Sequence, residues 1–224
     1  MKKSINLIAS VLLMALAFQS HAQSFRVPGD DQRSGKWDVT FQLITNESKT
    51  FSGEAGSSLS IRQRTGFGLG VYKNFNQHLA LGVDFAFSSP RYTATLQPSD
   101  PNDEAVVIDH RANFVTGQLR GTWNILKGNL TPYVDVGGGF TFVDSNVVDS
   151  EVPPTCWWDP WYGTICNTSS YNDTNFSYSG SLGMRWDAGR SVVLKLSYGT
   201  LFIDSGASST PNLNSLKFEI GARY

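Results

Sequence analysis

Apolar residues alternate with small, polar or charged residues along most of this chain of 224 residues. In the stretch LKFEIGARY, residues 216–224, one set of alternate positions is apolar, and the positions between them hold a lysine, a glutamate and an arginine. Side chains of a β-strand point alternately to its two faces, so this strand has one apolar face and one charged face. The alternation begins at Trp37 and helical periodicity is scarce, which predicts an all-β protein.

The alternating region divides into strands joined by connections of two lengths. Tight turns with the sequences NFNQH, LKGNL and DAGR follow the second, fourth and sixth strands, and long polar links follow the first, third, fifth and seventh. In an antiparallel meander this places all tight turns at one end, which is typical of an outer-membrane β-barrel. The eight predicted strands cover residues 36–44, 59–75, 78–92, 111–126, 130–144, 175–187, 190–203 and 213–224.

The two faces of these strands favour a membrane over water. Within the central apolar runs of the first seven strands, at residues 37–43, 67–71, 79–87, 115–125, 134–142, 176–186 and 192–202, the apolar face carries no charge. A charge facing lipid costs about 2 to 4 kcal/mol near the bilayer midplane, so this absence is informative. In a soluble sandwich the other face would meet water, and its many glycines and serines would suit that poorly. We therefore predict an eight-stranded antiparallel up-and-down transmembrane β-barrel.

Aromatic residues and inward charges extend this prediction. Aromatic side chains gather at membrane interfaces, and four of them lie on the apolar face at the turn ends of their strands, as an expected membrane girdle: Trp37, Trp123, Trp186 and Tyr224. Eight strands enclose a space that side chains just fill, so the inward charges are expected to pair in a lumenal network. A narrow or gated solute path is the alternative. The network residues are Arg64, Asp84, Arg120, Asp135, Arg185, Lys195, Lys217 and Glu219.

The N-terminus predicts export. Lys2 and Lys3 precede an apolar run of about 14 residues that ends at Ser20-His21-Ala22, a pattern of the kind that signal peptidase cleaves. The run is shorter than a membrane-spanning helix requires. The expected organisation is a signal peptide at residues 1–22, a periplasmic lead-in at 23–35 and the barrel at 36–224.

The most individual stretch is CWWDPWYGTIC in the third long loop, residues 145–174. In an exported protein two cysteines this close favour a local disulfide between Cys156 and Cys166. Tryptophan and tyrosine are common binding anchors, but they could equally form a small core within the loop. The candidate ligand-binding residues are Trp157, Trp158, Trp161 and Tyr162.

Other kinds of chemistry find little support. The net charge of −1 gives no reason to expect a nucleic-acid partner. Acyl chemistry needs a nucleophile with an orienting base, and after residue 22 only His78 and His110 could serve as histidine bases. His78 lies in a tight turn, and His110 lacks an H-x-S neighbour. We expect no enzyme, no metal and no cofactor, with lipid A modification as a remote alternative.

Three stretches resemble the outer membrane protein β-barrel superfamily, which includes the OmpA transmembrane domain and the OmpX/Ail group. LTPYVDVGGGFTF, residues 130–142, is similar to the fifth strand of these barrels, and FNQHLALGVDFAF, residues 75–87, to their turn between strands two and three. The last strand, with its terminal aromatic residue, resembles the signal read by the barrel-assembly machinery.

This resemblance implies a monomer in contact with outer-membrane lipid and lipopolysaccharide. A host protein, a glycan or a phage could bind at the loops. The expected role is surface interaction, by adhesion or ligand contact, together with envelope structure. A narrow porin-like channel is the alternative.

Overall fold

A computed structural model describes residues 33–224 apart from 53–55, 97–104, 149–154, 160–162, 168–169 and 205–210. The predicted signal peptide and most of the predicted lead-in lie outside the described residues. Among the residues that are described, none forms a helix with the length and apolarity needed to cross a bilayer.

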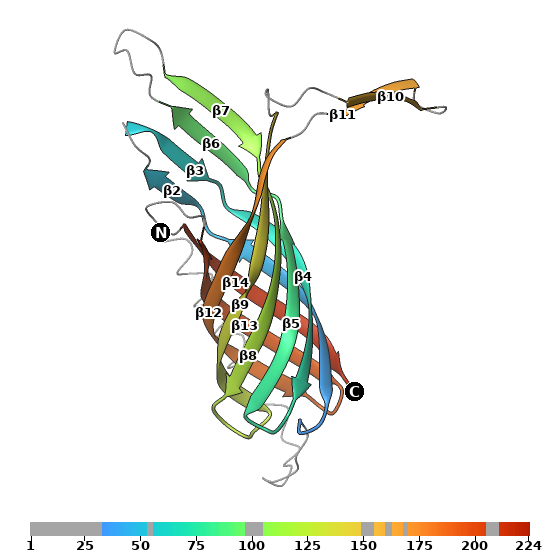
Figure 1. The fold of residues 1–224 in the computed structure, drawn as a ribbon. Coiled ribbons are helices and arrows are strands. Elements are labelled where there is room, and N and C mark those ends of the chain that lie inside the picture. The colour runs from blue at the N-terminus through green and yellow to red at the C-terminus, as the bar shows by residue number, and fades with distance from the viewer. Residues whose placement is uncertain are drawn as a thin grey trace. The chain divides into compact units, whose positions relative to one another are not determined.

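Eight antiparallel strands close into a barrel in which each strand pairs with its neighbours in the chain, and the first pairs with the last (Figure 1). In the closing pair, Phe41 lies opposite Ile220. The predicted fold class is confirmed. The strands are β1 (Trp37–Asn46), β4 (Arg64–Asn74), β5 (Leu79–Ser88), β8 (Asn113–Asn124), β9 (Leu130–Val148), β12 (Ser170–Ala188), β13 (Val192–Asp204) and β14 (Asn212–Arg223).

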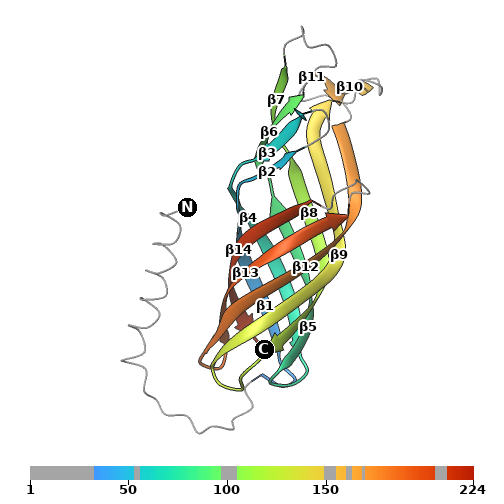
Figure 2. The same ribbon diagram turned by 90° about the vertical axis from the view of Figure 1, so that its left-hand side faces the viewer.

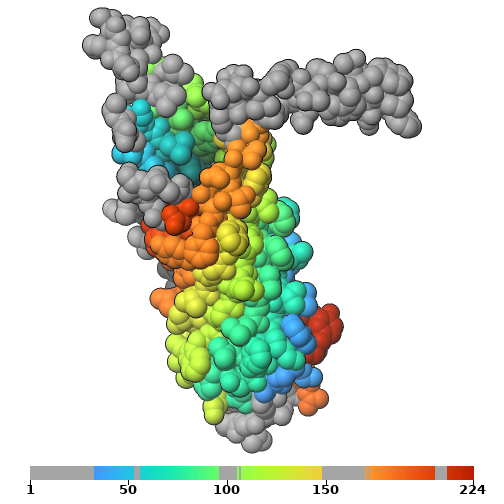
Figure 3. All heavy atoms as spheres, viewed as in Figure 1, coloured from blue at the N-terminus to red at the C-terminus, as the bar shows by residue number. Residues whose placement is uncertain are grey.

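The barrel is apolar outside and polar inside. Along β1 the alternate residues Phe41 and Leu43 are exposed, whereas Asp38, Thr40 and Gln42 are buried. Leu119 on β8 is 70% exposed, while the carboxylate-bearing Glu219 on β14 is fully buried. The barrel wall seen in Figure 3 is formed by the outer faces of β4, β5, β8, β9 and β12. Water would penalise this exposure of large apolar groups, and lipid accommodates it.

Three predicted strands are interrupted in the structure because the chain leaves the barrel there. The predicted strand 59–75 divides into β3 (Ser58–Ile61) and β4, and 78–92 divides into β5 and β6 (Arg91–Leu96). The predicted strand 111–126 starts at the last residue of β7 (Val106–Arg111), and the remainder of it contains β8. One break falls at Pro90, which has no N–H group for a strand ladder. The strands β3, β6 and β7 form a separate four-stranded sheet with β2 (Lys49–Ser52), in the order β2-β3-β6-β7.

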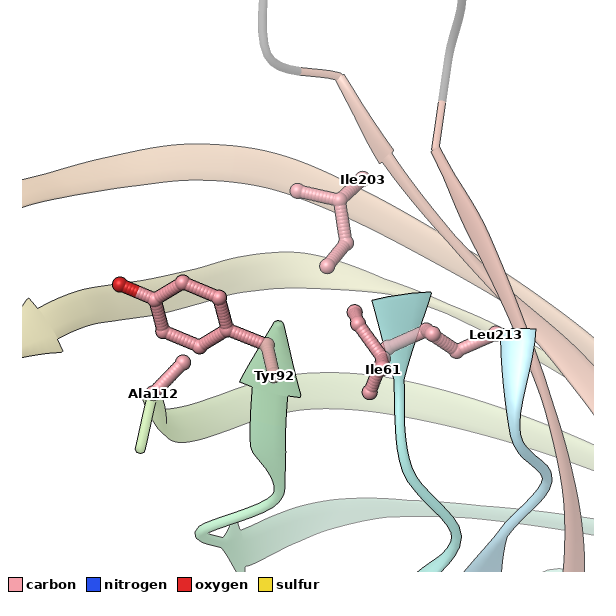
Figure 4. Packing of buried hydrophobic residues seen from close by; sticks show 5 residues of the cluster. All are labelled: Ile61, Tyr92, Ala112, Ile203 and Leu213. Atoms are coloured by element: carbon pink, nitrogen blue, oxygen red, sulfur yellow. The ribbon is translucent and has the colours of Figure 1, made fainter. Parts of the chain in front are cut away.

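This four-stranded sheet, called here the loop sheet, lies beyond the end of the barrel opposite the tight turns (Figures 1 and 2). We call this the loop end, and the opposite end the turn end. The loop sheet packs on barrel strands through a small apolar cluster, formed by Ile61, Tyr92, Ala112, Ile203 and Leu213 (Figure 4). Ile203 and Leu213 belong to β13 and β14, so the cluster joins the loop sheet to the barrel rim.

Candidate functional site

A cluster of opposite charges fills the middle of the lumen. The Arg120 guanidinium lies 2.7 Å from Asp84 and 2.7 Å from Asp135. Lys217 Nζ lies 2.9 Å from Glu219 and 3.4 Å from Asp84, and Lys195 Nζ lies 3.6 Å from Glu219. These three cations and three carboxylates balance each other in charge. We call these six residues the middle cluster: Asp84, Arg120, Asp135, Lys195, Lys217 and Glu219.

Neutral polar groups complete the middle cluster. The Tyr72 hydroxyl and the Gln42 amide both donate hydrogen bonds to Asp84, the latter over 2.8 Å. The Thr122 hydroxyl donates to Asp135 over 2.5 Å, and Lys195 Nζ lies 3.9 Å from the centroid of the Tyr72 ring. Because buried charges are costly unless paired and hydrogen-bonded, this cluster depends on keeping its partners together.

A second cluster closes the lumen near the turn end. Arg185 lies 2.5 Å from Asp38 and 3.0 Å from Asp187, and Arg223 lies 2.8 Å from Asp38 and 2.5 Å from Asp187. The two arginines and two aspartates therefore form a closed ring of ion pairs. Arg33 adds a third guanidinium, which pairs with Asp187 and donates to the carbonyl oxygens of Gln77 and Leu126 over 3.2 and 3.3 Å. We call these five residues the turn cluster: Arg33, Asp38, Arg185, Asp187 and Arg223.

On the loop side of the middle cluster the lumen is less full. A cavity of about 80 Å³ remains there. Its walls include the hydroxyls of Ser181 and Ser197, which have no hydrogen-bond partner among the described residues, and its floor includes Arg120 and Lys217. A cavity of this size and polarity has room for a few water molecules. Within the described ranges, no group of three or more His, Cys, Asp or Glu side chains is placed to hold a metal ion.

The predicted girdle residues lie on the outside of the barrel at the turn end. Trp37, Trp123, Trp186 and Tyr224 are 48%, 54%, 46% and 72% exposed. Lys73 Nζ lies 5.0 Å from the centroid of the Trp37 ring, as expected where a cation meets an aromatic face.

The histidines lie far apart along the chain in different surroundings. The His78 ring stacks on Trp123 at 5.6 Å, and its Nδ1 lies 2.7 Å from the Asn124 carbonyl oxygen. His110 is exposed on β7, opposite Tyr92.

The tryptophan-rich stretch forms a two-stranded hairpin of β10 (Thr155–Asp159) and β11 (Gly163–Asn167). Its register places Cys156 opposite Cys166, and Trp157 and Trp158 opposite Ile165 and Thr164. Directly opposed positions suit the short Cα separation of a disulfide, so the predicted bond fits this backbone and stays a prediction. Trp161 and Tyr162 lie outside the described residues.

A family model of the outer membrane protein beta-barrel domain matches residues 9–224. The chain belongs to this family. Its place is accordingly the outer membrane of Gram-negative bacteria. No curated protein matches the sequence.

Several solved structures resemble this outer-membrane barrel. OprG from Pseudomonas aeruginosa is 11% identical, with a TM-score of 0.53, over 87% of this chain and 99% of OprG. Neisserial surface protein A is 13% identical, with a TM-score of 0.48, over 85% of this chain and 96% of its own. Ail of Yersinia pestis is 15% identical, with a TM-score of 0.46, over 85% of this chain and 99% of Ail. At such low identity the likeness to OprG establishes the fold alone.

One predicted network residue of this outer-membrane barrel lies elsewhere. Arg64 is exposed at the loop end of β4, opposite Asn46, and belongs to neither cluster. Its position in the alternation points inward, but the chain turns away into the loop sheet two residues earlier, so Arg64 lies at the rim. The other predicted network residues all belong to the middle or the turn cluster.

Four members of the turn cluster are not among the predicted network residues. Asp38, Asp187 and Arg223 occupy inward positions of their strands, so the alternation already contained the signal. Arg33 precedes the first strand and has no such signal. It lies at the end of the predicted lead-in, which is therefore too long: the chain from Arg33 is attached to the barrel, and Gly35 donates its N–H to the Asn74 carbonyl oxygen over 2.8 Å.

Proposed function

We propose that this outer-membrane barrel displays its loops at the cell surface for contact with an external ligand, and that it does not conduct solutes. The observation that carries the proposal is the filling of the lumen by two successive clusters of buried ion pairs. Arg120 in the middle cluster is 11% exposed, and Arg185 in the turn cluster is fully buried. A solute crossing the lumen would have to separate these pairs, which leaves a charge buried without a partner.

The loops have the properties of a contact surface. The apolar cluster holds the loop sheet on the rim of the barrel, so the sheet can present side chains in fixed positions. The third long loop contributes a hairpin with Trp157 and Trp158 on one strand. Large aromatic side chains bind partners at a low cost in conformational entropy, which makes this hairpin the proposed contact. Host protein, glycan and phage receptor-binding protein are the candidate ligand classes.

Replacement of the tryptophans tests the contact. In the variant W157A/W158A/W161A we expect cells that express the protein to lose their adhesion to cultured epithelial cells, and the protein in nanodiscs to lose its binding on a glycan array. The matched control is V107A on the loop sheet, where Val107 is 61% exposed. Unchanged adhesion and unchanged array binding in the triple variant would refute the hairpin as the contact.

A conductance measurement distinguishes the display of surface loops from the transport of solutes. We expect refolded protein in planar bilayers to show no stepwise current at neutral pH. Regular single-channel openings of the unmodified protein would instead support the narrow channel, and would require the two clusters to rearrange.

A further inference from the structure

Three arginines lie side by side on one face of the loop sheet. In the pairing of β6 with β7, Arg91 lies directly opposite Arg111. The next residue after β3 continues its ladder with β6, because the Arg62 N–H donates to the Arg91 carbonyl oxygen over 2.9 Å. Residues directly opposite in a sheet share a face, so the three side chains form a row across β3, β6 and β7. We call it the arginine row: Arg62, Arg91 and Arg111.

The row faces away from the barrel mouth. Ile61 and Tyr92, which precede Arg62 and follow Arg91, lie opposite each other and are buried in the apolar cluster with residues of β13 and β14 (Figure 4). Because neighbouring residues of a strand point to opposite faces, the arginines point outward. All three are exposed.

The positive charge of the row is only partly compensated. Asp109 lies on the same face as Arg111, and its carboxylate is 3.4 Å from the Arg62 guanidinium, with both side chains more than half exposed. Among the described residues, no carboxylate forms an ion pair with Arg91 or Arg111. Like charges directly opposite each other destabilise a sheet, so an anion bound between them would remove a repulsion as well as add an attraction.

The row also lies at a defined height on the molecule. On the outside of β5 and β8, the last large apolar residues toward the loop end are Phe87 and Val115, both 37% exposed. Arg91 follows Phe87, and Arg111 precedes Val115, by four residues each, which at about 3.3 Å per residue is at most roughly 13 Å. The row therefore lies just beyond the apolar belt, at the level of lipid headgroups.

From this juxtaposition we infer that Arg62, Arg91 and Arg111 bind the phosphate groups of lipid A in the outer leaflet around the barrel. Guanidinium groups bind phosphate oxygens in pairs of parallel hydrogen bonds. Adjacent strands lie about 4.8 Å apart, so the row spans roughly 10 Å and can contact more than one phosphate of a headgroup. The inference concerns the outer side of the loop sheet and does not depend on the proposed contact at the tryptophan hairpin.

The test measures lipid A binding to the full chain in phosphatidylcholine nanodiscs by native mass spectrometry. We expect R62Q/R91Q/R111Q to bind bisphosphorylated lipid A about tenfold or more weakly than the unmodified protein. The matched control K36Q/K127Q/R190Q removes the same charge from exposed positions at the turn end and should bind as the unmodified protein does. Lipid A stripped of its phosphates should bind equally to all three proteins.

A lysine variant and two soluble anions extend the lipid A binding test. If the glutamine variant fails the heat-dependent shift in gel mobility that marks a folded barrel, R62K/R91K/R111K replaces it; lysine keeps the charge and loses the paired hydrogen bonds, so its affinity should be intermediate. Equal affinity of row variant and unmodified protein would overturn the inference. So would a row that binds soluble heparin or inorganic phosphate but shows no preference for phosphorylated lipid A.

Discussion

At the turn end of the barrel, Arg185 and Arg223 are buried and each contacts two aspartates. At the loop end, Arg91 and Arg111 are exposed, face each other directly and form no ion pair among the described residues. The same residue type thus has two opposite roles in one molecule. Buried arginines hold the strands of the barrel in place, and exposed arginines add repulsion that folding does not need. Exposed charges that destabilise a fold and form no ion pair within it are candidates for binding a ligand.

The largest expected effect comes from breaking the turn cluster. In Arg185→Ala, Asp38 and Asp187 each keep Arg223 but lose a buried partner, and removal of one member of a buried ion pair typically costs about 3 to 5 kcal/mol. We expect a loss of this order in the free energy of unfolding, measured by urea titration in lipid vesicles. Arg190→Ala, at an exposed turn position nearby, should change it by less than about 0.5 kcal/mol. Equal effects of the two substitutions would contradict a structural role for the cluster.

The next largest effect comes from a charge placed on the lipid-facing outer surface of the barrel. Leu119 lies in the middle of β8 and is 70% exposed, so Leu119→Arg should destabilise the folded barrel by about 2 to 4 kcal/mol in vesicles. Ile125 lies past the girdle residue Trp123, and Ile125→Arg should cost only about 0 to 1 kcal/mol. A similar cost at both positions would show that depth in the bilayer does not set the penalty, and would argue against the assigned girdle.

Close packing inside the barrel gives the next effect. A Cβ added at Gly139 would lie 2.0 Å from the Gly117 carbonyl oxygen and 2.7 Å from the Gln118 Cα, and neither backbone atom can move easily. Gly139→Ala should therefore destabilise the barrel by about 1 to 3 kcal/mol in the same titration. At Gly180 nothing lies within 4 Å of the added Cβ, so Gly180→Ala should be nearly neutral. The reverse order of the two variants would be incompatible with the β8–β9 pairing.

Strict alternation made the barrel predictable, because one rule decides both where a strand lies and which side chains meet inside it. Asp84 and Lys217 can be assigned to the lumen from their positions in this alternation alone. The alternation does not show where a strand leaves the barrel, since it continues from β3 into β4 with little change in composition. The alternation therefore predicts Arg64 inside the lumen and gives no sign of the loop sheet. Arg33 cannot be predicted for another reason: it lies outside any strand, and only the folded chain brings it to Asp187.

The smallest expected effect has the opposite sign and lies at the loop end. In phosphatidylcholine vesicles without anionic lipid, Arg91→Thr removes the repulsion from Arg111 and should raise the free energy of unfolding by less than about 1 kcal/mol. Threonine suits a strand, and Thr93 already occupies the same face of β6 two residues further on. When lipid A is added, the unmodified protein should gain stability and the variant should gain less, because a ligand that binds only the folded state stabilises it. If Arg91→Thr instead destabilises the protein without lipid A, Arg91 is a structural residue like Arg185, and the contrast between the two ends of the barrel disappears.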